Sequence, residues 1–254
     1  YDIAFAHRRF SIVDLSPAGH QPFVDPQNQV CVILNGEIYN YVEIRQELIE
    51  TGREFRTASD TEVLAQSYLE WGVSCFERLN GMWAVVLYDF RQRQLILCRD
   101  RLGKRPLYYF SENGRLAFAS EIKSLLQCDF VRACVDVNVE AVSPFILQGW
   151  RDLENQTFFA HIHSLPPGSF MRIDYQHEPT LHTYWSIPRI SRSLLSANSI
   201  SDAAAELLQR VLHVCARRAH APGLVGFEER MVGERVDPSR EPAAKLGEAR
   251  DRAR

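Results

Sequence analysis

The sequence lacks the features that mark several classes of protein. Its six cysteines (residues 31, 75, 98, 128, 134 and 215) include no Cys-x-x-Cys pair, which favours reduced thiols over a disulfide framework. No apolar run is long enough to span a bilayer. Acidic and basic residues nearly balance, with a net charge of −3, so neither a nucleic acid nor a membrane is indicated as a partner. We therefore expect a cytoplasmic protein.

What is present is the composition of an ordinary globular chain. The 254 residues are 46% hydrophobic and 24% charged, enough for one large domain or two small ones. The first residue is Tyr1 rather than Met, and "YDIAFAHRRFSIVD" begins inside an apparent strand. We therefore expect this chain to be a fragment of a longer protein.

Strand and helix patterns alternate up to about residue 125. "IAFAHRRFSIV" and "VCVIL" predict strands, and residues 41–51 predict a helix. A second helix is predicted over residues 60–71, because Ser59 and Glu62 fit a capping box ahead of an apolar face. That face consists of Val63, Leu64, Ser67, Tyr68 and Trp71.

Four short runs follow the second helix. "MWAVVLYD", "QLILCRD", "PLYYF" and "RLAFAS" are rich in strand-forming residues and are separated by turn residues, which predicts an antiparallel meander. "SEIKSLL" then predicts a short helix. Segregated helices and strands indicate an α+β sandwich, and we expect it to form within residues 1–126 with the helices packed outside two antiparallel sheets.

The remaining residues are less regular. "VEAVSPFILQGW" predicts a helix interrupted at Pro144, and "HSLPPGSFMRID" a turn followed by a strand. Residues 202–215 predict an amphipathic helix. The tail, residues 218–254, is crowded with Arg, Glu, Gly, Ala and Pro and is poor in aromatics, which predicts disorder.

The stretch "ILNGEIYNY" contains a dipeptide that usually marks a hairpin turn. Both Asn and Gly tolerate positive φ angles. Here, however, helical spacing follows Asn35 and Gly36 in place of a second strand. The pattern therefore places Asn35, Gly36 and Glu37 on a strand-to-helix connection.

Several stretches together resemble one family. They are "AHRRFSIVDLS-AGHQPF", "LNGEIYNY-E-R-EL", "SDTEVL", "LNGMWAVVLYD" and "CRDRLGKRPLYY…LAFASEIKSLL". In order and spacing they resemble the N-terminal glutaminase domain of AsnB-type glutamine-hydrolysing asparagine synthetases, a class II glutamine amidotransferase. The resemblance is dense over residues 4–126 and thin to about 188. It implies an Ntn-hydrolase-like αββα sandwich over residues 1–190, with residues 191–217 leading into a synthetase domain.

The resemblance also implies roles for individual residues. In the family, the side chain at Asn35 and the backbone N–H at Gly36 form the oxyanion hole, and such donors stabilise the developing negative charge. Arg9 corresponds to the clamp for the carboxylate of glutamine, and Asp60 to the partner of its amino group. Residues matching Ile12, Val13 and Glu37 also line the family's glutamine pocket. A solvent-facing strand Arg and a first-turn helix acid are the structural alternatives for Arg9 and Asp60.

Arg9, Asn35, Gly36 and Asp60 come from three separate segments. We expect them to converge on one pocket that opens toward a missing N-terminal segment. Residues 100–104 form a charged turn that we interpret mainly as a structural corner.

The sequence departs from the family in two respects. The family nucleophile is a Cys at the mature N-terminus with its own amino group as base, and none of the six cysteines matches it. The family's second domain, which binds ATP and Mg²⁺ through an SGGxDSS loop, is also absent. We therefore expect this chain to lack glutaminase activity, and its partners to be glutamine and a missing synthetase domain. No cofactor or metal is expected for the glutaminase domain itself, and a homodimer is an open alternative for the longer protein.

Two other interpretations stay open. The domain could be a non-catalytic scaffold, as in β-lactam synthetase, which a residue other than Cys after the initiator Met would indicate. It could also belong to another class II amidotransferase, such as glucosamine-phosphate synthase or phosphoribosylpyrophosphate amidotransferase. A scaffold needs neither a clamp nor an oxyanion hole, so the two together favour an ancestor that bound glutamine.

Overall fold

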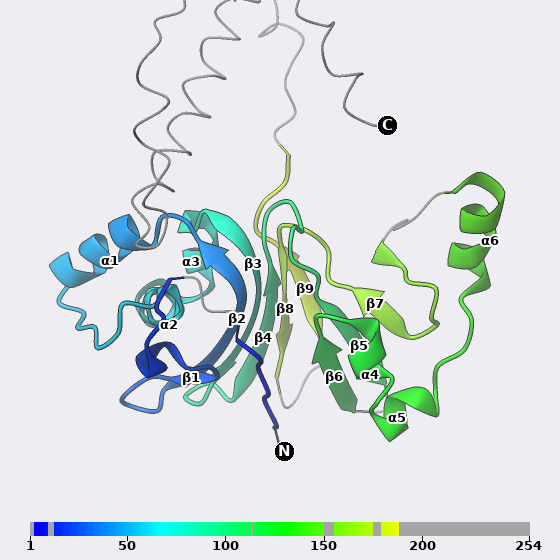
Figure 1. Ribbon diagram of the computed structural model, residues 1–254, viewed down its shortest axis with the longest axis horizontal. Helices are drawn as coiled ribbons and strands as arrows, with labels where there is room; N and C mark the ends of the chain where they lie inside the picture. Colours follow the sequence, from blue (N-terminus) through cyan, green and yellow to red (C-terminus); the bar gives the residue numbers. More distant parts are fainter. Residues whose placement is uncertain (1–2, 10–12, 113, 150–154, 175–178, 188–254) are drawn as a thin grey trace, which may run out of the picture.

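Two antiparallel sheets form the centre of the molecule, seen in a computed structural model that describes residues 3–9, 13–112, 114–149, 155–174 and 179–187. Figure 1 shows them side by side, with helices on both outer sides. The first sheet has the order β1-β2-β3-β4-β8-β9 and the second β6-β5-β7. The first comprises β1 (Phe23–Val24), β2 (Val30–Ile38), β3 (Gly81–Asp89), β4 (Gln94–Arg99), β8 (Ser169–Ile173) and β9 (Thr180–Thr183); the second comprises β5 (Tyr108–Glu112), β6 (Arg115–Ala119) and β7 (Ile162–Ser164).

The helices lie outside the sheets. On one side, α1, α2 and α3 lie against the first sheet, while α4 and α5 lie beside the second (Figure 1). This order of layers confirms the expected αββα sandwich. The bounds are α1 (Tyr41–Glu50), α2 (Asp60–Trp71), α3 (Cys75–Arg78), α4 (Ile122–Leu125), α5 (Asp129–Arg132) and α6 (Val139–Gln148), with short 3-10 turns η1 (Pro17–Gly19) and η2 (Gly72–Ser74). No helix in these described ranges is long and apolar enough to cross a membrane.

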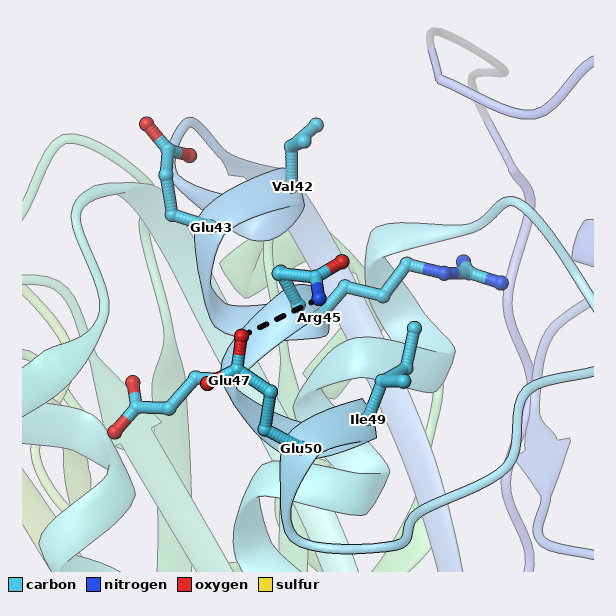
Figure 2. A pocket seen from close by; sticks show the side chains of 7 residues that line it. Val42, Glu43, Arg45, Glu47, Ile49 and Glu50 are labelled. Carbon is cyan, nitrogen blue, oxygen red and sulfur yellow. Dashed lines mark hydrogen bonds between the residues drawn. The ribbon is translucent and has the colours of Figure 1, made fainter.

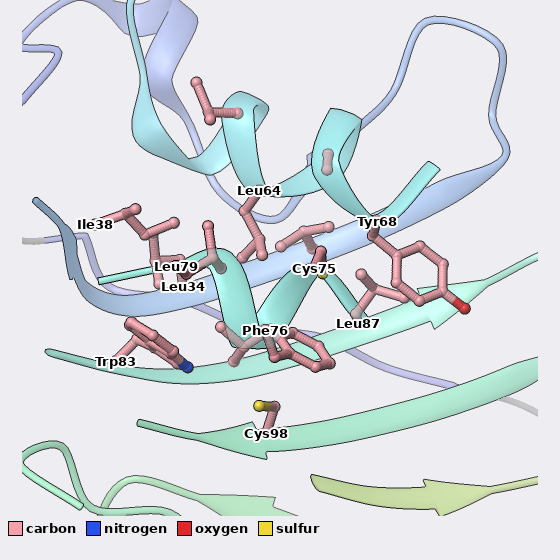
Figure 3. Packing of buried hydrophobic residues seen from close by; sticks show 14 of the residues in the cluster. Leu34, Ile38, Leu64, Tyr68, Cys75, Phe76, Leu79, Trp83, Leu87 and Cys98 are labelled. Carbon is pink, nitrogen blue, oxygen red and sulfur yellow. The ribbon is translucent and has the colours of Figure 1, made fainter. Parts of the chain in front are cut away.

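Three apolar clusters separate the layers. The largest lies between the first sheet and α1–α3; in Figure 3, Leu64 and Phe76 point from the helices toward the strands. The centroid of the Phe76 ring lies 6.0 Å from that of Phe170 in β8. A second cluster, including Ile33 and Leu97, lies between the two sheets. The third fills the space between the second sheet and α4–α5. Burial of these apolar faces is the main stabilising contribution to such a fold.

The start of α2 follows its predicted cap only in part. The Ser59 hydroxyl accepts a hydrogen bond from the Thr61 N–H at 3.1 Å, as an N-cap should. Glu62, however, does not close a capping box. Its buried carboxylate accepts bonds from the N–H groups of Arg56 and Thr57, so it holds the preceding loop.

Other sequence expectations need correction. The four runs do not form one meander: β3 and β4 belong to the first sheet, and β5 and β6 to the second. Residues 1–126 do not complete the sandwich either, because β7, β8 and β9 come from residues 162–183. Strand periodicity gives no information on which strands pair, so it could not separate these arrangements.

Two segments differ locally from their predictions. Residues 3–9 form no strand, because no neighbouring strand pairs with them; residues 10–12 lie outside the described ranges. The α6 helix continues through Pro144 and ends at Gln148; the φ of 73° at Gly149 is that of a left-handed C-cap. The predicted helix at 202–215 and the tail at 218–254 also lie outside the described residues.

Candidate glutamine site at the end of β2

Asn35, Gly36 and Glu37 lie within β2 rather than on a connection after it. Their partners in β3 are Ala84, Trp83 and Met82, and the pairing continues to Ile38 opposite Gly81. Only residues 39 and 40 separate this strand from α1. The prediction of a strand-to-helix connection at residues 35–37 was therefore wrong, because the strand continues to Ile38 and the connection begins at residue 39.

Gly36 is fixed as glycine by its contact with β3. Its φ angle is +147°, which residues with a side chain rarely adopt. A Cβ atom at this position would lie 2.0 Å from the backbone oxygen of Met82 and 2.8 Å from the Cα of Trp83. The dipeptide that suggested a turn thus reflects close approach of two paired strands.

The edge of β2 that faces β1 carries the groups of most interest; we call it the β1-side edge. In an antiparallel ladder, alternate residues direct their N–H groups to the same edge. On this edge, the Leu34 N–H donates to the side-chain oxygen of Gln21 at 2.7 Å, and the Ile38 N–H donates to Asp60 Oδ2 at 3.1 Å. The alternation places the Gly36 N–H between them, and among the described residues no acceptor bonds to it. A backbone donor is thereby left open beside a buried carboxylate.

The Asn35 side chain extends in another direction, toward the second sheet. Its Nδ2 donates to Ser120 Oγ at 2.9 Å, directly after β6. An amide nitrogen carries two hydrogens, so one remains for a further acceptor. This contact joins the Asn35 side chain of β2 to the segment that follows β6 in the second sheet.

Two acidic side chains are buried beside these donors. Asp60 and Glu37 are each only 6% exposed. Burial and, to a smaller extent, the negative charge of Glu37 together raise the pKa of Asp60 to about 6, against the lowering effect of the Ile38 hydrogen bond. Such a pair is electrostatically suited to a bound cation.

Arg9 is held by the loop that precedes β1. Its guanidinium donates to the backbone oxygens of Asp14 and Ser16 and packs against Gly19, where a Cβ would lie 2.4 Å from it. The Asp14 carboxylate in turn accepts from the Ala58 N–H at 3.3 Å, two residues before Asp60. Arg9 is therefore connected to the start of α2 through Asp14.

The predicted site residues are thus positioned by neighbouring elements, apart from two. Val13 is half-buried, with no contact that assigns it a role, and Ile12 lies outside the described residues. The glutamine-site assignment of the set stays a prediction. An open hollow on the outer face of α1, lined by residues such as Val42, Arg45 and Ile49, includes none of them (Figure 2).

Comparison with known proteins decides the family. The sequence profile described as "Glutamine amidotransferase domain" matches residues 1–185. The chain belongs to the glutamine amidotransferase domain family. This confirms the resemblance found in the sequence.

The relatives of this amidotransferase domain are longer proteins. "Asparagine synthetase [glutamine-hydrolyzing] 2" of Bacillus subtilis is 34% identical over 84% of this chain and 29% of its own length. "Amidase chry2" of Gibberella zeae is 31% identical over 84% of this chain and 31% of its own length. The chain thus spans less than a third of these relatives. Among solved structures, a glutamine phosphoribosylpyrophosphate amidotransferase of B. subtilis aligns over 70% of this chain and 34% of that one, with 20% identity and a TM-score of 0.47.

The predicted structural corner of the amidotransferase domain is present. The Asp100 carboxylate, 1% exposed, accepts from the N–H groups of Trp83, Leu102, Lys104 and Arg105 at 3.0–3.2 Å. This one side chain therefore joins β3 to the turn after β4.

Three cysteines are buried within the first sheet and its helices. Cys31, Cys75 and Cys98 are at most 6% exposed. Burial raises the pKa of Cys31 to about 11 and raises the pKa values of Cys75 and Cys98 as well. These thiols are therefore poor nucleophiles at neutral pH, as expected for Cys31 and Cys98.

Sequence reasoning missed two polar residues that organise the site. Asp14 and Gln21 are 7% and 6% exposed and bridge separate segments. Asp and Gln side chains are mostly exposed in proteins, so nothing in the sequence indicated that these two would be buried. The motif "AGHQPF" drew attention to this segment but gave no reason to select Gln21.

Proposed function

We propose that this chain is the glutaminase part of a longer glutamine-hydrolysing synthetase. Its role would be to release ammonia from glutamine for ATP-dependent amidation of aspartate or a related carboxylate. The observation that carries the proposal is the open Gly36 N–H on the β1-side edge, with the Asn35 amide beside it and the buried Asp60 carboxylate next along the edge. The names of the asparagine synthetase relatives support the choice of reaction.

The first chemical role is to stabilise an oxyanion. When a thiolate attacks the side-chain carbonyl carbon of glutamine, the carbonyl oxygen gains a negative charge. The Gly36 N–H and the remaining Asn35 N–H would donate to it. Such a donor contributes about 3–4 kcal/mol to the transition state in a protease where one was removed.

The second role is to bind the amino-acid end of the substrate. An ammonium group next to Asp60 and Glu37 would neutralise part of their buried charge and lower the pKa of Asp60 again. The Arg9 guanidinium has five N–H donors, of which the loop carbonyls use two in the contacts described. The others would remain for the α-carboxylate.

The third role, nucleophilic attack, requires a reactive thiol. We assign it to a cysteine beyond this sequence, because Cys31, Cys75 and Cys98 are buried with raised pKa values. Cys128 and Cys134 flank α5, which packs against the second sheet and not against β2. The thiolate would displace the amide nitrogen, which leaves as ammonia with a proton from the base, and water would then hydrolyse the thioester to glutamate. ATP and Mg²⁺ would bind the synthetase domain. On this proposal, the present chain binds glutamine without hydrolysing it.

Calorimetry tests the binding step with the chain itself. We expect glutamine to bind and Asp60→Asn to weaken binding at least tenfold, whereas Asp129→Asn, an exposed acid on α5, leaves it unchanged. In the longer protein, Asn35→Ala should reduce ammonia release by about 10²–10³-fold. A chain that binds no glutamine, or binds it equally well without the Asp60 charge, would support the scaffold interpretation instead.

A further inference from the structure

Gln21 lies where the pairing between β1 and β2 stops. In this ladder Phe23 pairs with Val32 and Val24 with Cys31. Continuing the same register brings Gln21 opposite Leu34 and Gly19 opposite Gly36. The backbone does not continue this ladder: residues 17–19 form the turn η1, and the Leu34 N–H bonds to the side chain of Gln21. The side chain thus takes the acceptor position that a backbone carbonyl would occupy.

The other end of this side chain reaches α2. Gln21 Nε2 donates to Thr61 Oγ1 at 3.1 Å, and both residues are buried, at 6% and 2% exposure. One amide therefore bonds the residue before Asn35 and the residue after Asp60. A glutamine amide combines this length with an acceptor, a donor and zero charge.

We propose that Gln21 is a positioning residue for the glutamine site, an inference that rests on the proposed function. It acts in two ways. Together with the turn η1, it ends the ladder before Gly19 can pair with Gly36, so that the Gly36 N–H stays free for the substrate oxygen. It also fixes the oxyanion donors of β2 relative to the ammonium partner, Asp60, because β2 and α2 are joined through its amide.

Hydrogen exchange of the backbone amides tests the first action without any ligand. In the wild-type chain, the Gly36 amide should exchange at least tenfold faster than those of Leu34 and Ile38, since only the latter two are bonded. In Gln21→Met, a variant of similar size without either bond, the Leu34 amide should exchange at a rate near that of Gly36. A wild-type Gly36 amide as slow as its neighbours would overturn the inference.

Glutamine titration followed by NMR and calorimetry tests the second action. We expect the wild-type Gly36 amide resonance to shift on adding glutamine. Gln21→Met should abolish the shift and weaken binding at least tenfold. Thr61→Val, which removes only the partner on α2, should weaken binding several-fold and provides a milder variant if Gln21→Met does not fold.

Asp25 supplies the matched control. Its carboxylate bonds the Val30 N–H at 2.6 Å, on the same β1-side edge but at the opposite end of β2. Asp25→Ala should lower the melting temperature at least as much as the Gln21 and Thr61 variants, yet keep the glutamine Kd within twofold. If the Gln21 and Thr61 variants also keep their Kd within twofold, the positioning role is wrong while the glutaminase proposal stands. A wild-type chain that binds no glutamine contradicts the glutaminase proposal, and with it the role of Gln21 in binding.

Discussion

Asp60 Oδ2 accepts a hydrogen bond from the Ile38 N–H at 3.1 Å, so the first residue of α2 covers the end of β2. The carboxylate is 6% exposed, and burial, aided by Glu37, raises its pKa to about 6. A group whose pKa is higher in the folded than in the unfolded state stabilises the fold at low pH. That stability is lost as pH rises toward and through the folded value. The ionised form of Asp60 therefore destabilises this domain.

The first prediction is that Asp60→Asn stabilises the fold at pH 8. The pKa difference of about two units, from 3.8 to about 6, corresponds to about 3 kcal/mol, and the asparagine oxygen can still accept from Ile38. The gain should shrink as pH falls through 6 toward 4. Urea unfolding of both proteins across this range measures it.

The matched control for this prediction is Asp25→Asn. Asp25 is 1% exposed, and its carboxylate accepts from the N–H groups of Gln27, Gln29 and Val30. Neutralising a carboxylate with three such donors weakens charge-assisted bonds, so this variant should be less stable at pH 8. An Asp60→Asn protein that is also less stable at pH 8 would show that the Asp60 charge is compensated.

The second prediction concerns close packing at Gly36. Gly36→Ala should destabilise the domain by about 3 kcal/mol or more, because the new methyl group meets the Met82 backbone oxygen. Gly52 has a positive φ of 92° as well but no atom within 4 Å of its would-be Cβ, so Gly52→Ala should cost only about 1 kcal/mol. Equal losses in urea unfolding would mean that backbone conformation, and not the strand contact, determines the cost.

These glycines show which parts of the fold were predictable from sequence. The α2 helix and its Ser59 cap depend on residues close in sequence, and both were predicted correctly. The need for glycine at residue 36 depends on a contact with Met82, which is 46 residues away along the chain. Local turn propensity therefore suggested a connection where strand pairing extends β2.

The candidate site was likewise predictable only in part. Asn35, Gly36 and Asp60 could be selected because they match a family pattern, and the structure places them around the end of β2. The structure was needed for Gln21 and Glu62, because their roles depend on burial and on partners in other segments. Gln and Glu side chains are usually exposed, so the residue types alone did not predict that these two would be buried.

The third prediction concerns thiol reactivity. Among the cysteines in the described ranges, Cys134, which is exposed, should react first with iodoacetamide at pH 8. Cys31, Cys75 and Cys98 should react only as fast as the domain unfolds. Peptide mass spectrometry over time gives each rate, and addition of urea should remove the differences. Fast labelling of Cys31 in the folded domain would contradict its burial and reopen it as a nucleophile.

The last prediction concerns the corner at Asp100. Asp100→Ala should lower the free energy of unfolding by about 3 kcal/mol, because four backbone N–H groups, including that of Trp83, lose one shared acceptor in a buried position. Asp129→Ala removes an equal charge from a side chain that is 88% exposed and should change stability by no more than about 0.5 kcal/mol. Urea unfolding at pH 7 compares the two. Because Trp83 pairs with Gly36, the Asp100 variant should also speed hydrogen exchange along β2 and β3, whereas a loss confined to residues 100–105 would show that the corner is independent of the site.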